Sequence, residues 1–323
     1  MTRVLLTGAA GFIGSHLAEA LVARGDEVVG FDTFDPFYPR AVKERNLAAL
    51  RAGRGFRLVE GDIRDVAAVR AELTPDTVVV HLAAKAGVRP SLADPAGYAS
   101  VNVAGTAAVL DACRQAGVSR LVFGSSSSVY GDDTPVPFRE DAACIAPVSP
   151  YAATKRAGEL LVGSVAGVFG LRVISLRFFT VYGPRQRPDL AIHAFARRLL
   201  KGEPLPIFGD GTDSRDYTYV DDIVRGVLAA IDRTGRLAAG QVETYNLGGD
   251  RPVTLARMVE TLAAAIGVTP VIDRRPRQPG DVHHTAADLT RARAGLGFEP
   301  RMPFDQGIAR FVSWIRDDAR SQS

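Results

Sequence analysis

The stretch Thr7-Gly8-Ala9-Ala10-Gly11-Phe12-Ile13-Gly14-Ser15-His16-Leu17 decides the fold of this chain. It follows an apolar run at residues 4–6, which is typical of a short buried strand, and apolar residues then recur at helical spacing. Gly8 permits a tight turn, Gly11 admits a close approach to a pyrophosphate, and Gly14 lets the helix pack closely on the strand. Because the first N–H groups of a helix bind anions, the stretch predicts a dinucleotide site.

A second apolar run at residues 28–31 ends in Asp32, about 20 residues after the glycines, where a ribose-binding acid is expected. A carboxylate at that position favours NAD over NADP, since a 2′-phosphate would meet its negative charge. Arg40 and Lys43 lie downstream and can soften this preference. The alternative, a plain surface turn, explains the glycines but neither the strand nor the acid.

The composition is that of an ordinary globular protein. The 323 residues are 46% hydrophobic and 23% charged, with a formal net charge of +3, which does not suggest nucleic-acid binding. Because a predicted strand starts almost at Met1, we expect no signal peptide, and no apolar run approaches a membrane span of about 20 residues. Cys113 and Cys144 match neither a metal site nor a disulfide framework, so we expect a cytoplasmic protein without a metal.

Short apolar runs alternate with helical patterns through the first half of the chain; after the two strands above they lie at residues 56–59, 77–82, 121–123 and 172–177. This alternation predicts an α/β fold, a Rossmann-type doubly wound parallel sheet with both faces covered. Ligands of such sheets bind beyond the carboxyl ends of the strands. That rule selects Asp32, Asp62, Ala83, Ala84 and residues 125–128 and 178–180.

The composition of the sequence changes after Pro184: Arg, Pro and Gly become frequent, and helical patterns are separated by irregular loops. We therefore predict a dinucleotide-binding domain at residues 1–184, with a return segment near 215–235. Residues 185–323 are predicted to form a smaller mixed α/β substrate domain.

Tyr151 and Lys155 lie four residues apart and so share one face of a predicted helix at residues 151–169. A nearby ammonium favours a phenolate, which can take a proton from an alcohol while hydride leaves the same carbon. Such a pair also occurs by chance on many helices. Ser126, after a later strand, can share the proton, and the ordered set of glycine turn, acid, serines and Tyr-Lys helix favours catalysis.

At these residues the chain resembles the extended short-chain dehydrogenase/reductase family, specifically its NAD-dependent nucleotide-sugar 4-epimerases. The resemblance covers nearly the whole length and includes His81-Leu82-Ala83-Ala84, Arg177-Phe178-Phe179-Thr180 and Arg215-Asp216-Tyr217. It implies a sheet of about seven strands. It also implies a homodimer joined through two helices, here near residues 102–116 and 151–169.

The resemblance further implies a tightly bound NAD that is regenerated in each cycle. Its binding residues would be Gly8, Gly11, Phe12, Ile13, Gly14, Asp32, Lys43, Asp62, Ile63, Leu82, Ala83, Ala84, Asn102, Tyr151, Lys155 and Phe178.

The residues after Ser126 discriminate between reactions within the family. Dehydratases place Asp and Glu directly after their catalytic hydroxyl and decarboxylating relatives place a Glu close by, whereas Ser127 and Ser128 stand here. Epimerisation at carbon 4 is therefore expected, by transient oxidation, rotation of the 4-keto intermediate and hydride return. Ser127, Ser128, Thr180 and Arg89 resemble the UDP-glucuronate 4-epimerase branch, although Lys85 stands where that branch often has Gln. Neutral hydroxyl donors suit the carboxylate of a glucuronate.

Binding of the UDP part is expected in the second half of the chain. Arg215 is predicted to bind the diphosphate; the alternative is an ion pair with Asp213 or Asp216. Asp281 is predicted to bind the ribose. Either Arg185 or Arg187 closes over the uracil or pairs with Asp189, and the strand that contains Ile207 reads the uracil edge.

Several other functions are compatible with parts of this pattern. UDP-glucose/UDP-galactose 4-epimerisation and UDP-glucuronate decarboxylation are the nearest alternatives. A net oxidoreductase or a non-catalytic dinucleotide sensor are more distant ones. No nucleic-acid or membrane partner is expected.

Overall fold

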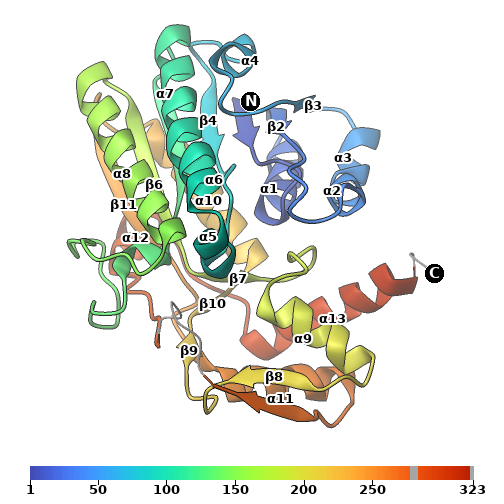
Figure 1. Cartoon of the computed structure of the whole chain (residues 1–323). Helices are drawn as coiled ribbons and strands as arrows, with labels where there is room; N and C mark the ends of the chain where they lie inside the picture. Colours follow the sequence, from blue (N-terminus) through green and yellow to red (C-terminus); the bar gives the residue numbers. More distant parts are fainter. Residues whose placement is uncertain (277–282, 321–323) are drawn as a thin grey trace.

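The computed structural model describes residues 1–276 and 283–320, and a sheet of seven parallel strands forms its centre (Figure 1). In spatial order the strands are β11 (Val242–Leu247), β6 (Arg172–Phe178), β5 (Arg120–Ser126), β4 (Val78–His81), β1 (Arg3–Thr7), β2 (Glu27–Asp32) and β3 (Phe56–Glu60). Every neighbouring pair is parallel, and the predicted fold class is confirmed.

The central strands β1 and β4 are mostly apolar and buried because both faces of the sheet are covered there. In β1, Val4 and Leu6 pack into one hydrophobic core, whereas Leu5 packs into a second core on the opposite face. All of them are fully buried. A side-chain period of two residues on a doubly covered sheet yields a continuous apolar run.

The helices divide between the two faces (Figure 1). One face carries α4 (Val66–Ala71), α7 (Gly105–Ala116) and α8 (Pro150–Phe169), and the other carries α1 (Phe12–Ala23) and α10 (Val220–Thr234). Shorter segments connect them: α2 (Arg40–Asn46), α3 (Ala48–Ala52), α5 (Val88–Ala93), α6 (Pro95–Ala99), a π-helical turn (Ser100–Ala104), a 3-10 turn (Ser127–Tyr130) and α12 (Thr290–Leu296).

The strand order reverses between β1 and β4. From β1 the chain proceeds outward through β2 and β3, and it then returns to β4 on the other side of β1. A crevice opens at the carboxyl ends of strands where the order reverses in this way. Residues that follow β1, β2 and β4 therefore meet at one place.

A smaller part of the fold lies beyond this crevice, at the bottom of Figure 1. It contains α9 (Ala191–Leu200), α11 (Leu255–Ile266), α13 (Phe304–Arg320) and the two-stranded pairs β7 (Thr180–Tyr182) with β10 (Tyr217–Tyr219), β9 (Ser214–Arg215) with β12 (Val253–Thr254), and β8 (Leu205–Phe208) with β13 (Ile272–Arg275). None of the helices in the described ranges is long and apolar enough to cross a membrane.

Two elements differ in extent from the sequence expectation. The strand expected at residues 121–123 continues to Ser126, because Ser125 and Ser126 pair with Arg177 and Phe178 of β6. The seventh strand is β11, which lies beyond the return segment expected near residues 215–235. Long-range pairing, rather than local propensity, extends the strand into the serines.

Candidate active site

The glycine turn after β1 is tight enough to exclude side chains. Gly8 has φ +75°, and a Cβ atom there would lie 2.9 Å from the amide nitrogen of Ala83. A Cβ atom on Gly14 would lie 2.1 Å from the carbonyl oxygen of Gly8. Gly11 is the N-cap of α1 and offers no side chain to its first N–H groups. These amides are therefore available to an anion.

The carboxylate of Asp32 is held in place at the end of β2. It accepts hydrogen bonds from the backbone N–H of Ala10 at 3.0 Å and of Phe34 at 2.8 Å, and the ammonium of Lys43 lies 3.6 Å away. Arg40 instead donates to Glu60 and Glu44 on the surface. Lys43, and not Arg40, is thus the cation beside the predicted ribose acid.

A single cavity of about 610 Å³ connects the glycine turn to the Tyr-Lys helix. It brings together most of the residues predicted from the sequence: Gly8, Gly11, Phe12, Ile13, Gly14, Asp32, Lys43, Asp62, Ile63, Leu82, Ala83, Ala84, Ser126, Ser127, Ser128, Tyr151, Lys155, Phe178, Thr180, Arg187 and Arg215. The strands that carry them are far apart in sequence, so the shared cavity is a property of the fold.

Two predicted residues lie behind the cavity wall rather than in it. Asn102, in the π-helical turn, accepts a hydrogen bond from the backbone N–H of Lys85 at 2.7 Å and donates to its carbonyl oxygen at 2.9 Å. Asn102 therefore fixes the backbone of the loop after β4 from the side that faces away from the cavity. Ile207 is buried in the hydrophobic core beneath β8.

Two predicted arginines are directed elsewhere in this structure. Arg185 forms an ion pair with Glu19 of α1 at 2.7 Å, and not with Asp189. The guanidinium of Arg89 lies over the ring of Phe208, 4.9 Å from its centroid. Asp281 lies outside the described residues.

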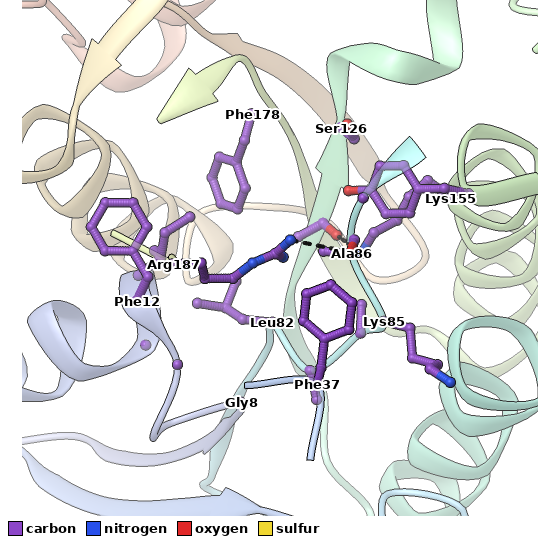
Figure 2. A pocket seen from close by; sticks show the side chains of 18 of the residues that line it. Gly8, Phe12, Phe37, Leu82, Lys85, Ala86, Ser126, Lys155, Phe178 and Arg187 are labelled. Atoms are coloured by element: carbon purple, nitrogen blue, oxygen red, sulfur yellow. Dashed lines mark hydrogen bonds between the residues drawn. The ribbon is translucent and has the colours of Figure 1, made fainter. Parts of the chain in front are cut away.

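Arg187 extends into the middle of the cavity between Phe178 and Phe37, as Figure 2 shows. Its guanidinium donates to the carbonyl oxygen of Ala86 at 3.2 Å and to Asp189 at 2.9 and 2.6 Å. The predicted pairing with Asp189 is therefore present, yet the charge still faces the site. Arg215 also lines the cavity, and its guanidinium donates to the carbonyl oxygens of Ser214 at 3.0 Å and His283 at 3.2 Å.

Tyr151, Lys155 and Ser126 converge at the far end of the cavity. Burial raises the pKa of Tyr151, while the Ser126 hydroxyl and the charge of Arg187 act to lower it. Burial lowers the pKa of Lys155 to about 8, and its ammonium donates to the carbonyl oxygen of Gly124 at 2.7 Å. Ser126 and Arg187 therefore act toward the phenolate, against the larger opposing effect of burial.

Behind the loop after β4, His81 lies in a closed chain of hydrogen bonds. Thr106 donates to the carbonyl oxygen of Asn102 at 2.6 Å and so accepts from His81 Nε2, 3.1 Å away. Burial lowers the pKa of His81 to about 3, so the ring is neutral with its proton on Nε2. Nδ1 then accepts from the Thr7 hydroxyl at 2.7 Å, and Thr7 Oγ1 accepts from the backbone N–H of Ala83 at 3.2 Å.

We expect His81→Asn to reduce the pH dependence of stability. Burial lowers the pKa of His81 to about 3, so the unfolded chain binds this proton first as the pH falls. The wild type therefore loses about 1.4 kcal/mol of unfolding free energy per pH unit through this group between about pH 6 and pH 4. Urea unfolding at pH 7, 6, 5 and 4 should show a shallower slope for His81→Asn. The same slope for both proteins contradicts the prediction, and the exposed His284→Asn serves as control.

The sequence interpretation missed several cavity residues, chiefly Phe37 and Tyr38 in the loop after β2 and Leu190 before α9. The two aromatic residues follow the ribose acid closely, which is the only local signal they offer. In the part of the chain that the structure describes, no group of three His, Cys, Asp or Glu side chains is arranged to hold a metal ion.

The chain matches the model of the NAD dependent epimerase/dehydratase family over residues 4–248. It belongs to this family. UDP-glucuronate 4-epimerase 3 from Arabidopsis thaliana is 42% identical, over 96% of this chain and 76% of the relative. A probable UDP-glucuronate 4-epimerase from Rhizobium meliloti is 39% identical over 98% of both chains. The crystal structure of UDP-glucuronic acid 4-epimerase from Bacillus cereus with UDP-glucuronic acid and NAD has a TM-score of 0.91 at 35% identity, covering 98% of this chain and 99% of that one.

The residues of this family member fit an NAD molecule. The uncapped start of α1 and the closely packed glycines suit a pyrophosphate, and the fixed carboxylate of Asp32 suits a ribose diol. Neither Gly8 nor Gly14 has room for a Cβ atom, so this closely packed turn requires glycine at both positions. When bound, NAD would supply the oxidation and re-reduction of a substrate carbon.

Proposed function

We propose that this chain catalyses the 4-epimerisation of a UDP-sugar, with UDP-glucuronate and UDP-galacturonate as its substrate and product. One observation carries the proposal: Tyr151, Lys155 and Ser126 share a cavity wall with the hydroxyls of Ser127, Ser128 and Thr180. Among the described residues that line this end, none is an acid. The named relatives support the same substrate.

In this proposal Tyr151 takes the proton of the sugar 4-hydroxyl and later returns it, and Ser126 donates a hydrogen bond to the same oxygen. Lys155, held on Gly124, keeps a positive charge beneath the reacting groups. Arg187 adds a second positive charge, whose effect on Tyr151 favours the deprotonated phenol. Without an acid beside Ser126, the site has no group to protonate and expel a neighbouring hydroxyl.

The proposed substrate contacts place hydrogen-bond donors at the negatively charged groups of UDP-glucuronate. Ser127, Ser128 and Thr180 would donate to the sugar carboxylate, and Arg215 to the diphosphate. Arg89, with Phe208 beside it, remains a candidate contact for the nucleotide, as do Arg185, Ile207 and Asp281. We assign this nucleotide site to residues 185–323, apart from α10 and β11, which pack on or belong to the central sheet.

We also propose that the chain is a homodimer joined through α7 and α8. The outer surface of α8 exposes Leu160, Val168 and Phe169 at 59%, 71% and 58%, and exposed apolar side chains gathered on one helix indicate an interaction surface. Sedimentation at micromolar concentration should give twice the mass of the chain. A monomer would contradict this part of the proposal. A cytoplasmic location stays a prediction from the use of cysteine.

Incubation with UDP-glucuronate, followed by mass spectrometry and separation of sugar isomers, tests the function. A new isomer of unchanged mass supports epimerisation, whereas loss of carbon dioxide indicates decarboxylation. No reaction with UDP-glucuronate but conversion of UDP-glucose would move the assignment to the glucose/galactose class. Stoichiometric consumption of added NAD would instead indicate a net oxidoreductase.

We expect Ser127→Ala and Thr180→Val to reduce the preference for UDP-glucuronate over UDP-glucose. Each variant removes a neutral donor from the proposed carboxylate contact, which corresponds to about 1–3 kcal/mol, or about 5- to 150-fold in kcat/KM for the acidic sugar. Activity on UDP-glucose should change little. The ratio of the two kcat/KM values is the measurement, and an unchanged ratio in both variants would remove these residues from the carboxylate contact.

A further inference from the structure

A buried ion pair lies directly behind the catalytic residues and takes no part in the scheme above. Arg177 of β6 donates through Nε and Nη2 to the two carboxylate oxygens of Glu159 at 2.8 and 2.9 Å. The two side chains are only 4% and 6% exposed. Isolated buried charges are costly, so a bidentate pair at this place calls for a reason beyond stability.

Glu159 continues the helical face of the catalytic pair. Tyr151, Lys155 and Glu159 are spaced four residues apart on α8, so their side chains form a row along one face. The same spacing that pointed to Lys155 in the sequence therefore points to Glu159. Figure 2 places Lys155 at the cavity end of this helix, beside Ser126.

Each residue of this row lies against one residue at the end of β5. Tyr151 and Ser126 line the same cavity, where Ser126 acts to lower the pKa of Tyr151, and Lys155 donates to the carbonyl oxygen of Gly124 at 2.7 Å. Ser125 completes the set, because its hydroxyl donates to Glu159 Oε1 at 2.7 Å. Three consecutive strand residues are thus matched to three positions of one helix face.

The carboxylate of Glu159 has little freedom to turn away. Besides Arg177 and Ser125 it accepts from Arg156 Nη1 at 2.9 Å. Arg177 is itself fixed, since it lies opposite Ser125 in the β5–β6 register and 4.7 Å from the ring centroid of Tyr130. Burial works against the charge of Glu159, but the hydrogen bonds and charge of Arg177 hold its pKa below the usual range.

We propose that Glu159 is a positioning residue: through Ser125 and Arg177 it fixes the end of β5 against α8, so that Ser126 stays beside Tyr151 in the cavity. This inference rests on the proposed function for the roles of Tyr151 and Ser126. The positive charge of Lys155 is supported by the same carboxylate, which raises the pKa of that lysine against the effect of burial.

The test compares Ser125→Ala and Glu159→Gln with Ser175→Ala as matched control. Ser175 is equally buried in the neighbouring strand, and among the described residues its hydroxyl has no hydrogen-bond partner. We expect Ser125→Ala to lower kcat for UDP-glucuronate about 5- to 50-fold with KM within about twofold, because UDP contacts are untouched. Ser125→Thr, which keeps the hydroxyl, should restore most of the rate. Ser175→Ala should retain the wild-type rate.

A second measurement does not depend on the substrate. Tyrosine labelled with ¹³C at Cζ allows Tyr151 to be titrated in the NAD-bound protein, its signal being assigned by absence in Tyr151→Phe. The groups that face Tyr151 are Ser126 on β5, Arg187 from the loop after β7, Tyr98 on α6 and Lys155 on its own helix. If loss of the Ser125–Glu159 hydrogen bond lets Ser126 move away from Tyr151, the pKa of Tyr151 should rise by about half a unit or more in Ser125→Ala and Glu159→Gln.

The two measurements separate the possible failures. A wild type that does not convert UDP-glucuronate refutes the proposed function, and the titration still decides whether Glu159 positions Ser126. Unchanged kcat and unchanged Tyr151 titration in Ser125→Ala overturn the inference. A Glu159→Gln protein that only melts at a lower temperature, with the Tyr151 titration unmoved, assigns the ion pair a purely structural role and overturns it equally.

Discussion

Replacement of Tyr151 by Phe is expected to lower kcat for UDP-glucuronate by about 100- to 10,000-fold, the usual contribution of a positioned acid–base group. The variant removes one oxygen and keeps the ring, whose edge contact with Tyr98 at 6.3 Å between centroids is preserved. KM and the amount of NAD that copurifies should therefore stay close to the wild-type values. Steady-state kinetics and an assay of bound NAD give both numbers.

Tyr245→Phe is the matched control for this variant. Its hydroxyl donates to Glu243 at 2.6 Å and lies outside the cavity, so its loss should leave kcat unchanged. If Tyr151→Phe keeps full epimerase activity while both proteins remain folded, a different group moves the proton and the proposed scheme is wrong.

The parts of this site that local sequence predicts are those set by short-range geometry. The glycine turn, Asp32 and the Tyr151–Lys155 spacing each occupy one strand–turn–helix unit or one helix face, and all of them reach the same cavity. The motifs that carried the family resemblance are local in the same sense. The match to the family model over residues 4–248 confirms that resemblance.

The parts that the sequence leaves open depend on contacts between distant segments. The sequence leaves two roles open for Arg187, a nucleotide contact or a pair with Asp189, and the structure shows the Asp189 pair with the guanidinium still in the cavity. The sequence predicts Ser125 after the strand, but pairing with Arg177 extends β5 to include it. Its bond to Glu159 then depends on how α8 packs against β5, which no local pattern encodes.

Gly14→Ala is expected to damage both stability and cofactor binding. The added Cβ atom would lie 2.1 Å from the carbonyl oxygen of Gly8 and 3.0 Å from Cα of Ala9, both backbone atoms of the turn. Because backbone cannot rotate aside, α1 must move away from β1, which costs about 1–3 kcal/mol or more of unfolding free energy. The same movement displaces the N–H groups that are proposed to bind the pyrophosphate, so NAD affinity should fall about 10- to 100-fold.

Gly53→Ala is the control, because a Cβ atom there would come no closer than 3.7 Å to its neighbours and the backbone has φ −99°. Thermal melts with and without added NAD measure both effects, since at a fixed ligand concentration the stabilisation of the folded state grows with the logarithm of the affinity. Gly53→Ala should show the wild-type shift and Gly14→Ala a much smaller one. A full NAD-induced shift in Gly14→Ala would mean that the cofactor is held chiefly by Asp32 and the far end of the cavity, and that the start of α1 is not its main anchor.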